Sequence, residues 1–280
     1  MNTQEFIIAA LAEDIGSGDH STLASIDAKV VGTAKLIVKE AGIIAGIRIA
    51  KEVFLHLDKE AVFTAFHTDG EYLEVGTIAF TVKAKVHAIL QAERLVLNTM
   101  QRMSGIATLT HNYVEKIKNY STTILDTRKT TPLFRAFEKE AVLLGGAKNH
   151  RMGLYDMIML KDNHIDYCGG IEKAIAAANN YLKEQQLQLP IEVETRSLDD
   201  VKRVVKVGGV QRIMLDNFTP QEIEAALVLI NKQFETEASG GINFDTIEAY
   251  AATGVDFISV GAVIHHATSL DLSLKAVLHE

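Results

Sequence analysis

Residues 191–218, IEVETRSLDDVKRVVKVGGVQRIMLDNF, decide the fold of this chain. Two short apolar stretches, IEVET at 191–195 and RIMLD at 212–216, read as strands, and each ends in polar or charged residues. The stretch 197–208 between them reads as a helix. A strand, a helix and a second strand of these lengths form a β-α-β unit, whose strands are parallel and whose crossover is right-handed.

The same alternation continues on both sides of this unit. Further strands are predicted within 122–130, 156–164, 233–241 and 256–262, and further helices within 171–186, 219–232 and 243–254. About six or seven such units in roughly 150 residues favour an incomplete α/β barrel. An open doubly wound sheet is the alternative.

The first part of the chain has a different pattern. Helices are predicted within 6–16, 46–57 and 91–118, and strands within 30–46 and 61–90, where Asp69-Gly70 and Gly76 supply turns. This half is therefore mixed α and β, without the regular repeat of the second half.

The composition excludes some classes of protein. The 280 residues carry a net charge of −8, whereas general nucleic-acid binders are usually basic, so no nucleic-acid partner is expected. No apolar stretch reaches the roughly 20 residues needed to cross a bilayer, so no membrane association is expected. The single cysteine, Cys168, allows no intrachain disulfide and is expected to be packed, which favours a cytoplasmic location.

The predicted strands of the second half end in chemically active residues. In an α/β barrel the active site lies at the carboxyl ends of the strands. These ends and the loops after them carry Asp126, Thr127, Arg128, Lys129, Lys148, His150, Arg151, Lys161, Asp162, Glu194, Arg196, Asp216, Asn217, Ser239, Gly240, Gly241, Val260, Gly261 and Ala262.

Each group in this set has a physical use. Arginine forks match carboxylates and phosphates, and two carboxylates that face a pocket can hold Mg²⁺ or sugar hydroxyls. Glycine-rich loops expose backbone N–H groups that can bind phosphate. Taken singly, Arg128 and Lys129 could be a solvated pair, and Glu194 and Asp216 could be helix caps. Taken together, the residues predict an enzyme for an anionic, phosphorylated substrate with a divalent metal.

Nine stretches of sequence carry a family resemblance in the family's own order. They are EDIGSGDHST (13–22), ERLVLNTMQRMSGIATLT (93–110), DTRKTTP (126–132), GGAKNHRMGL (145–154), MLKDNHI (159–165), IEVET (191–195), MLDNF (214–218), EASGGI (237–242) and GVDFISVGA (254–262). Together they cover nearly the whole chain and resemble the quinolinate phosphoribosyltransferase family.

The resemblance implies a reaction and an architecture. Quinolinate and 5-phosphoribosyl 1-diphosphate would give nicotinate mononucleotide, diphosphate and CO₂, with Mg²⁺, in de novo NAD synthesis. The fold class would be α/β, with an N-terminal α/β sandwich domain at 1–107, joined by the tail 270–280, and an incomplete (open) α/β barrel at 108–269. The assembly would be a homodimer or homohexamer with active sites shared between subunits.

The resemblance also implies roles for individual residues. Catalysis would involve Lys129, Lys161, Glu194 and Asp216, and the last two would also bind Mg²⁺. The carboxylates of quinolinate would be bound by Arg128, His150, Arg151 and, from a neighbouring subunit, Arg94. The other substrate-binding residues would be Thr127 and the phosphate cradle formed by Ser239, Gly240, Gly241, Val260, Gly261 and Ala262.

Other functions remain open from the sequence. A related protein associated with molybdate transport shares the fold, but the presence of Arg94, Arg128 and Arg151 favours a dicarboxylate substrate. A binding or regulatory barrel would be expected to lose a metal-binding acid or a cation, and an aldolase could use Lys161 as its Schiff-base lysine. The loop TTPLFR (130–135) has leucine where the family usually has glycine, so we expect this loop to bend differently.

Overall fold

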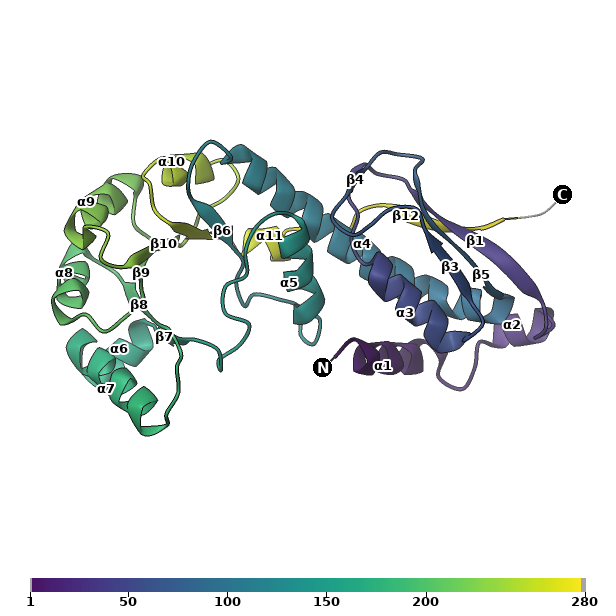
Figure 1. Cartoon of the computed structure of the whole chain (residues 1–280), viewed down its shortest axis with the longest axis horizontal. Coiled ribbons are helices and arrows are strands. Elements are labelled where there is room, and N and C mark those ends of the chain that lie inside the picture. The colour runs from purple at the N-terminus through teal and green to yellow at the C-terminus, as the bar shows by residue number, and fades with distance from the viewer. Residues whose placement is uncertain (1, 278–280) are drawn as a thin grey trace. The chain divides into compact units, whose positions relative to one another are not determined.

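The structure, a computed structural model, describes residues 2–277, which form two compact units (Figure 1). The first, here called the sheet unit, comprises 2–111, 131–146 and 266–277. The second, here called the barrel unit, comprises 112–130 and 147–265.

The sheet unit is built on four antiparallel strands. Their order is β12-β1-β5-β3. The strands are β1 (Val31–Val38), β3 (Val62–Ala65), β5 (Ile78–Lys85) and β12 (Leu272–Val277), and β2 (Gly42–Ile43) pairs separately with β4 (Tyr72–Leu73). In β1, alternate residues are buried, because successive side chains of a strand point to opposite faces. The last strand of the chain thus completes the sheet that the first strand begins.

Helix α3 (Ile47–Leu57) packs on this sheet against β3 and β5. The sheet unit also contains α1 (Thr3–Ile15), α2 (His20–Ser25), α5 (Arg135–Leu144) and the first part of α4 (Val86–Lys116). Phe54 of α3 is fully buried, with ring centroids 6.1 Å from Phe63 and 6.2 Å from Phe80. Gly105 of α4 permits a close crossing, since a Cβ there would lie 1.9 Å from the carbonyl oxygen of Thr268.

The predicted strand region 61–90 is wrong in its last five residues. The helix α4 begins at Val86, and β5 ends at Lys85, which pairs with Val31, the first residue of β1. Beyond that point β5 has no residue of β1 to pair with, so the chain turns into the helix that the apolar spacing of the following residues favours.

The barrel unit contains six parallel strands. They are β6 (Thr123–Leu125), β7 (Ile158–Leu160), β8 (Ile191–Thr195), β9 (Arg212–Asp216), β10 (Glu235–Ser239) and β11 (Phe257–Ser259). Their order is β6-β11-β10-β9-β8-β7. Strands β7 to β11 follow one another around the sheet, and β6 joins the far end beside β11. A doubly wound sheet reverses direction at a switch point, and this sheet does not, so that alternative is wrong.

The barrel is open, as the sequence predicts. Within residues 2–277, β6 and β7 do not pair with each other. The edge of β6 is extended only by a single parallel bridge between Leu125 and Lys148. The predicted α/β fold class, with an incomplete barrel in the second half of the chain, is therefore confirmed.

Helices cover the outer face of the curved sheet (Figure 1). They are α6 (Asp162–Cys168), α7 (Ile171–Glu184), α8 (Leu198–Val207), α9 (Pro220–Ile230), α10 (Ile247–Ala251) and α11 (Ala262–His265). Ser197 and Thr219 begin α8 and α9, because their side chains accept hydrogen bonds from backbone N–H groups of the first turn. Cys168, expected to be packed, is instead exposed at the end of α6.

The loop that contains Leu133 keeps a conformation suited to glycine. Leu133 has φ = 64° and is 79% exposed. Left-handed backbone costs a non-glycine residue roughly 1–2 kcal/mol. The substitution of leucine therefore leaves a strained turn.

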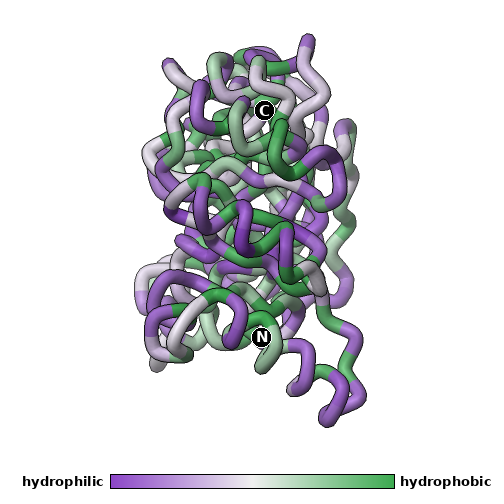
Figure 2. Tube along the Cα trace, turned by 90° about the vertical axis from the view of Figure 1, so that its left-hand side faces the viewer, coloured by the Kyte–Doolittle hydropathy of each residue, from purple (hydrophilic) through white to green (hydrophobic). Residues whose placement is uncertain are grey.

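Hydrophobic residues are spread along the chain in short stretches (Figure 2). Among residues 2–277, no helix is long and apolar enough to cross a membrane.

Candidate active site

The inner face of the barrel sheet is polar in its central strands. Neighbouring strands in parallel register place Glu192 beside Arg212, and Arg212 beside Glu235. Two residues further along each strand, alternation returns the side chains to the same face. That inner face carries Glu192, Glu194, Arg212, Met214, Asp216, Glu235, Glu237 and Ser239.

The residues between them are the buried Val193, Ile213, Leu215 and Ala238, which face the outer helices. The interior of an α/β barrel is usually filled by branched apolar side chains. The polar inner face is therefore unusual for such a barrel, and it indicates that the chemistry takes place on this face of the sheet.

Two carboxylates and a lysine meet at the carboxyl ends of the strands. Burial, followed by the charge of Asp216, raises the pKa of Glu194. Burial also raises the pKa of Asp216, against the opposing effects of Asn217, Lys161 and Ser239. Asn217 donates a hydrogen bond from Nδ2 to Asp216 Oδ2 over 2.7 Å. The structure thus brings together Lys161, Glu194, Asp216 and Ser239, as the sequence predicts.

The glycine-rich loops after β10 and β11 pack closely against neighbouring loops. Gly240 has φ = 96°, and a Cβ there would lie 2.3 Å from Asn217 Oδ1 and 2.8 Å from the Asn217 backbone nitrogen. Asn217 N–H in turn donates to the Ser239 carbonyl over 2.8 Å. Only glycine allows this approach, so the loop lies with its backbone, rather than a side chain, against the strand ends.

Lys129 lies beside the loop after β11. A Cβ at Gly261 would lie 3.2 Å from Lys129 Cδ. The adjacent Val260 N–H donates to the Leu125 carbonyl over 2.9 Å, which joins this loop to the end of β6. Ala262 begins the short helix α11. The glycine loop and the exposed Lys129 are therefore neighbours.

Two arginines of the barrel unit also lie close together. Burial, followed by the charge of Arg128, lowers the pKa of Arg151. Arg128 Nε is buried and has no hydrogen-bond partner within residues 2–277. Arg151 Nη1 donates to the Met157 carbonyl over 3.3 Å, and the Lys129 N–H donates to Thr127 Oγ1 over 3.1 Å. Two adjacent guanidinium groups repel each other unless an anion lies between them, so the pair suits a doubly charged ligand.

His150 lies inside the barrel unit rather than on the surface of its loop. Its side chain is buried, with Nε2 3.0 Å from Glu192 Oε2 and 3.3 Å from Glu237 Oε2. Arg212 reaches the same group from β9, with Nη1 2.9 Å from Glu237 Oε2. We call these four residues, His150, Glu192, Arg212 and Glu237, the interior charge cluster.

The cluster retains protons. Burial alone would lower the pKa of His150, but the hydrogen bonds and charges of Glu192 and Glu237 raise it to about 9. Burial and the charge of Glu237 raise the pKa of Glu192 to about 7. Between about pH 6.5 and pH 9, the cluster in the folded chain therefore holds a proton that the unfolded chain has released.

Sequence reasoning missed three members of this cluster. Glu192 precedes Glu194 by two residues, Arg212 precedes Asp216 by four, and Glu237 precedes Ser239 by two. Each of the three therefore shares a strand face with the strand-end residue named with it. Period-two alternation could have indicated them. The remaining predicted residue, Arg94, is exposed on α4 in the sheet unit and forms no ion pair within residues 2–277.

Two groups of side chains have the chemistry of a metal site. His150, Glu192 and Glu237 offer ligand atoms within 4.8 Å of one another, but Arg212 already neutralises Glu237. Glu194 and Asp216 are half-buried carboxylates, burial and the charge of Asp216 raise the pKa of Glu194, and carboxylate oxygens are ligands that Mg²⁺ prefers. The second pair fits a divalent cation better.

A cavity of about 1200 Å³ lies at the other end of the strands, where Arg212, Lys232 and Gln233 contribute to its walls. Neither the carboxylate pair Glu194 and Asp216 nor the arginine pair Arg128 and Arg151 lines it. We therefore place the chemistry at the carboxyl ends of the strands.

The raised pKa values predict how stability depends on pH. His150 shifts from its usual 6.5 to about 9, so its contribution is complete below about pH 6.5 and is lost as the pH rises through about 9. The pKa of Glu192 is also raised, from 4.5 to about 7, so its titration changes the free energy of unfolding in the same direction. The free energy of unfolding should fall over this range by up to about 1.4 kcal/mol per pH unit. Glu192→Gln, which resembles the protonated acid, should flatten this dependence in denaturant unfolding. Equal slopes in the two proteins would contradict the prediction.

Comparisons with known proteins agree with this architecture. The family model described as "Quinolinate phosphoribosyl transferase, C-terminal domain" matches residues 106–275, and the model of the N-terminal domain matches residues 19–104. The two matches cover most of both compact units.

Individual relatives are similar along most of their length. The chain is 43% identical over 281 residues to the chloroplastic nicotinate-nucleotide pyrophosphorylase [carboxylating] of Arabidopsis thaliana, covering 95% of this chain and 80% of that protein. It resembles the crystal structure of NadC from Streptococcus pyogenes with a TM-score of 0.92 and 40% identity, covering 97% of this chain and 95% of that one. The Francisella tularensis nicotinate-nucleotide pyrophosphorylase structure gives a TM-score of 0.92 and 38% identity, covering 98% and 96% of the two chains. Both domain models match, and these relatives are similar to most of the chain, so the chain belongs to the quinolinate phosphoribosyltransferase family.

Proposed function

We propose that this chain transfers a phosphoribosyl group from 5-phosphoribosyl 1-diphosphate to quinolinate with loss of CO₂, the nicotinate mononucleotide-forming step of de novo NAD synthesis. The observation that carries this proposal is the adjacent pair Arg128 and Arg151, in which Arg128 Nε is buried without a partner in the described residues. Quinolinate carries two neighbouring carboxylates, and a pair of guanidinium groups matches that charge and geometry.

The carboxylate-binding group comprises Arg128, Arg151 and Arg94, and His150 lies next to Arg151 in the chain. In this proposal Arg94 acts from a neighbouring subunit of a homodimer or homohexamer, and its exposure on α4 supports such a role. No charged group of this set is replaced in the sequence, which argues against the molybdate-linked and binding-barrel alternatives. Membership of the family argues against an aldolase that uses Lys161.

The donor is bound by the loops at the strand ends. The backbone of the phosphate cradle, formed by Ser239, Gly240, Gly241, Val260, Gly261 and Ala262, binds the 5′-phosphate, and Thr127 helps to shape the loop after β6. Lys129, beside Gly261, and Lys161, beside the carboxylate pair, neutralise the diphosphate side. The close packing of Gly240 on Asn217 supports a backbone cradle, because no side chain fits there.

Glu194 and Asp216 would hold Mg²⁺ and bind the ribose hydroxyls. A bound Mg²⁺ would supply positive charge to the diphosphate as it leaves. The two carboxylates stabilise the positive charge that develops on the ribose. Burial is the main cause of the raised pKa of each acid, and the charge of Asp216 adds to it at Glu194, which supports a cation at this place.

The chemistry needs no covalent intermediate with the enzyme. The ring nitrogen of quinolinate forms a bond to C1 of the ribose while the bond to diphosphate breaks. The resulting pyridinium then loses its adjacent carboxylate as CO₂, because the electron pair left on carbon lies beside the positive nitrogen, and a proton replaces it. The residues contribute mainly positioning and electrostatic stabilisation.

We extend the proposal to organisation and location. A functional N-terminal domain at 1–107 with the tail 270–280 and a barrel domain at 108–269 are supported by the pairing of β12 with β1. The exceptions are 108–111, 131–146 and 266–269, which belong to the sheet unit. The chain acts in the cytoplasm in this proposal, which its single cysteine supports. The relatives include chloroplastic and mitochondrial proteins, so fractionation of the source cells is the test.

The first prediction concerns the reaction itself. With quinolinate, the phosphoribosyl donor and Mg²⁺, the protein should form nicotinate mononucleotide and CO₂, measured by chromatography and by release of labelled CO₂. Nicotinate in a parallel reaction should give no product, because it lacks the second carboxylate that the arginine pair binds. Removal of Mg²⁺ with a chelator should greatly slow the reaction. Absence of product from folded protein with Mg²⁺ present would reject the proposed function.

The second prediction concerns the arginine pair. Arg128→Ala and Arg151→Ala should each lower kcat/KM for quinolinate by about 100-fold or more, because a charged pairing with the substrate is lost. The unfolding temperature should change little. Arg203→Ala is the matched control, because Arg203 pairs with Glu172 on the outer helices. Wild-type kinetics with quinolinate in either site variant would remove the pair from the mechanism.

The third prediction concerns the shared site. Arg94→Ala and Arg151→Ala proteins should each be nearly inactive, and subunit exchange between them should restore part of the activity. A hybrid assembly would contain some sites with both arginines intact. The fraction of hybrids is measured by native mass spectrometry with two affinity tags. If verified hybrids remain as inactive as the parent variants, Arg94 does not act across a subunit interface.

A further inference from the structure

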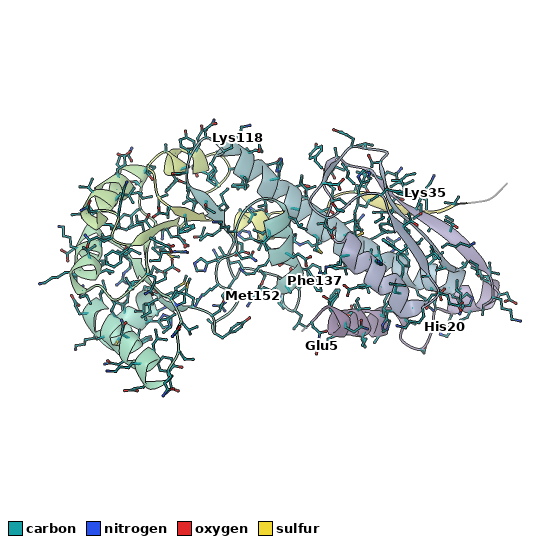
Figure 3. All side chains as sticks on the ribbon, in the orientation of Figure 1. Glu5, His20, Lys35, Lys118, Phe137 and Met152 are labelled. Atoms are coloured by element: carbon teal, nitrogen blue, oxygen red, sulfur yellow. The ribbon has the colours of Figure 1, made fainter. Side chains whose placement is uncertain are left out.

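The chain segment that carries His150 and Arg151 has no regular secondary structure, yet side chains and strands hold its backbone in place. Lys148 N–H donates to the Ile124 carbonyl over 2.9 Å, and His150 N–H donates to Asp126 Oδ1 over 2.8 Å. In the next residues, Met152 N–H donates to Asp156 Oδ2 over 2.6 Å. Figure 3 marks Met152 in this loop. The loop is thus held at several successive residues rather than left free to move.

The imidazole of His150 holds Arg151 between these points. The Arg151 backbone N–H donates to His150 Nδ1 over 2.7 Å, so Nδ1 must carry a free electron pair. The ring hydrogen therefore lies on Nε2, which faces Glu192 at 3.0 Å and Glu237 at 3.3 Å. A second ring proton on Nδ1 would set two donors against each other, so the proton that His150 shares with its two carboxylates, and that the group releases only near pH 9, lies toward the carboxylates.

The carboxylates fix the position of the ring. Glu192 and Glu237 are fully buried, so each needs a cation or donor at close range. Arg212 supplies one, with Nη1 2.9 Å from Glu237 Oε2, and its guanidinium lies over the Phe257 ring at 4.1 Å from the centroid. The His150 ring supplies the other. A different ring orientation would leave buried charge unpaired.

A network of this kind is a poor way to gain stability alone. Buried ion pairs often add nothing over well-packed apolar residues, and their best-attested benefit is a single defined geometry. The geometry defined here is that of the residue next to His150 in sequence, whose guanidinium lies near Arg128.

We propose that the interior charge cluster positions Arg151 for binding a substrate carboxylate, and that His150 acts as the positioning residue through its ring rather than as a direct ligand. This inference rests on the proposed function and deepens it. It assigns to Glu192, Arg212 and Glu237 a part in quinolinate affinity, although they are not themselves expected to touch the substrate.

The test compares three carboxamide variants of the full-length protein. Glu237→Gln and Glu192→Gln each remove one buried charge at nearly constant volume, and Glu192→Gln leaves the Arg212–Glu237 pair in place as a safeguard if the other variant fails to fold. Glu235→Gln is the matched control, because exposed Glu235 contacts the same Arg212 at 2.9 Å but not His150. Thermal unfolding monitors the fold of each protein.

Two readouts separate positioning from plain stability. Quinolinate binding without the donor is measured by calorimetry, and KM and kcat are measured for both substrates. The buried variants should weaken quinolinate binding and raise its KM by about 10-fold or more, while the donor's KM changes less than about 2-fold, because a small displacement of a positioned group is costly. Glu235→Gln should match the wild type. Lower thermal stability with unchanged quinolinate affinity would overturn the proposal.

A third readout does not depend on activity. Nitrogen-15 spectra of the imidazole should show His150 Nδ1 as an acceptor in the wild type and a changed ring signal in Glu237→Gln and Glu192→Gln. If the wild type neither binds nor converts quinolinate, the proposed function fails, and these spectra alone decide whether the cluster fixes the ring. A protonated Nδ1 in the wild type, or identical spectra in all variants, would overturn the inference.

Discussion

The pairing of two fully buried carboxylates, Glu192 and Glu237, is the constraint on which the barrel unit depends. Removing a carboxylate from water costs several kcal/mol unless a cation or donor replaces the lost hydration. Arg212 from β9 and His150 from the loop before β7 provide that replacement at 2.9 to 3.3 Å. Satisfying these charges requires β8, β9 and β10 to keep their register and requires the loop to fold inward. The polar interior is thus tied to the arrangement of the active-site loops.

The inner face has two layers with different tasks. In the deeper layer positive and negative groups are already paired, so it has little remaining capacity for a ligand. In the layer at the carboxyl ends, Glu194, Asp216 and Lys161 are partly open, and burial raises the pKa of both acids. In the proposed function this layer holds a metal cation, an anion and a phosphate at separate places, and the buried Nε of Arg128 has no hydrogen-bond partner among residues 2–277. Such a division suits a reaction between two strongly anionic substrates, in which charge must be balanced before the groups can approach.

Much of this could be predicted from the sequence, because it depends on local patterns. Short apolar strands with charged ends, alternating with helices, give a parallel sheet, and the residues at their ends must then meet at one edge. Lys161, Glu194, Asp216 and Ser239 meet there for that reason. The strand end at Lys85 was missed, because it is set by the partner strand β1 and not by the residues 86–90 themselves. Cys168 was expected to be packed, but it lies at an exposed helix end.

The sequence by itself determined the α/β class, the family and the set of residues at the strand ends, because periodicity and motif order are properties of the chain alone. Only the tertiary structure decided that the sheet has consecutive strand order without a reversal, and that His150 is buried against Glu192 and Glu237. Contacts of this kind join residues that are 42 to 87 positions apart, and the energy that selects them comes from removing charge from water. That energy exists only once the surrounding strands have closed around the charges, so no local pattern in the sequence records it.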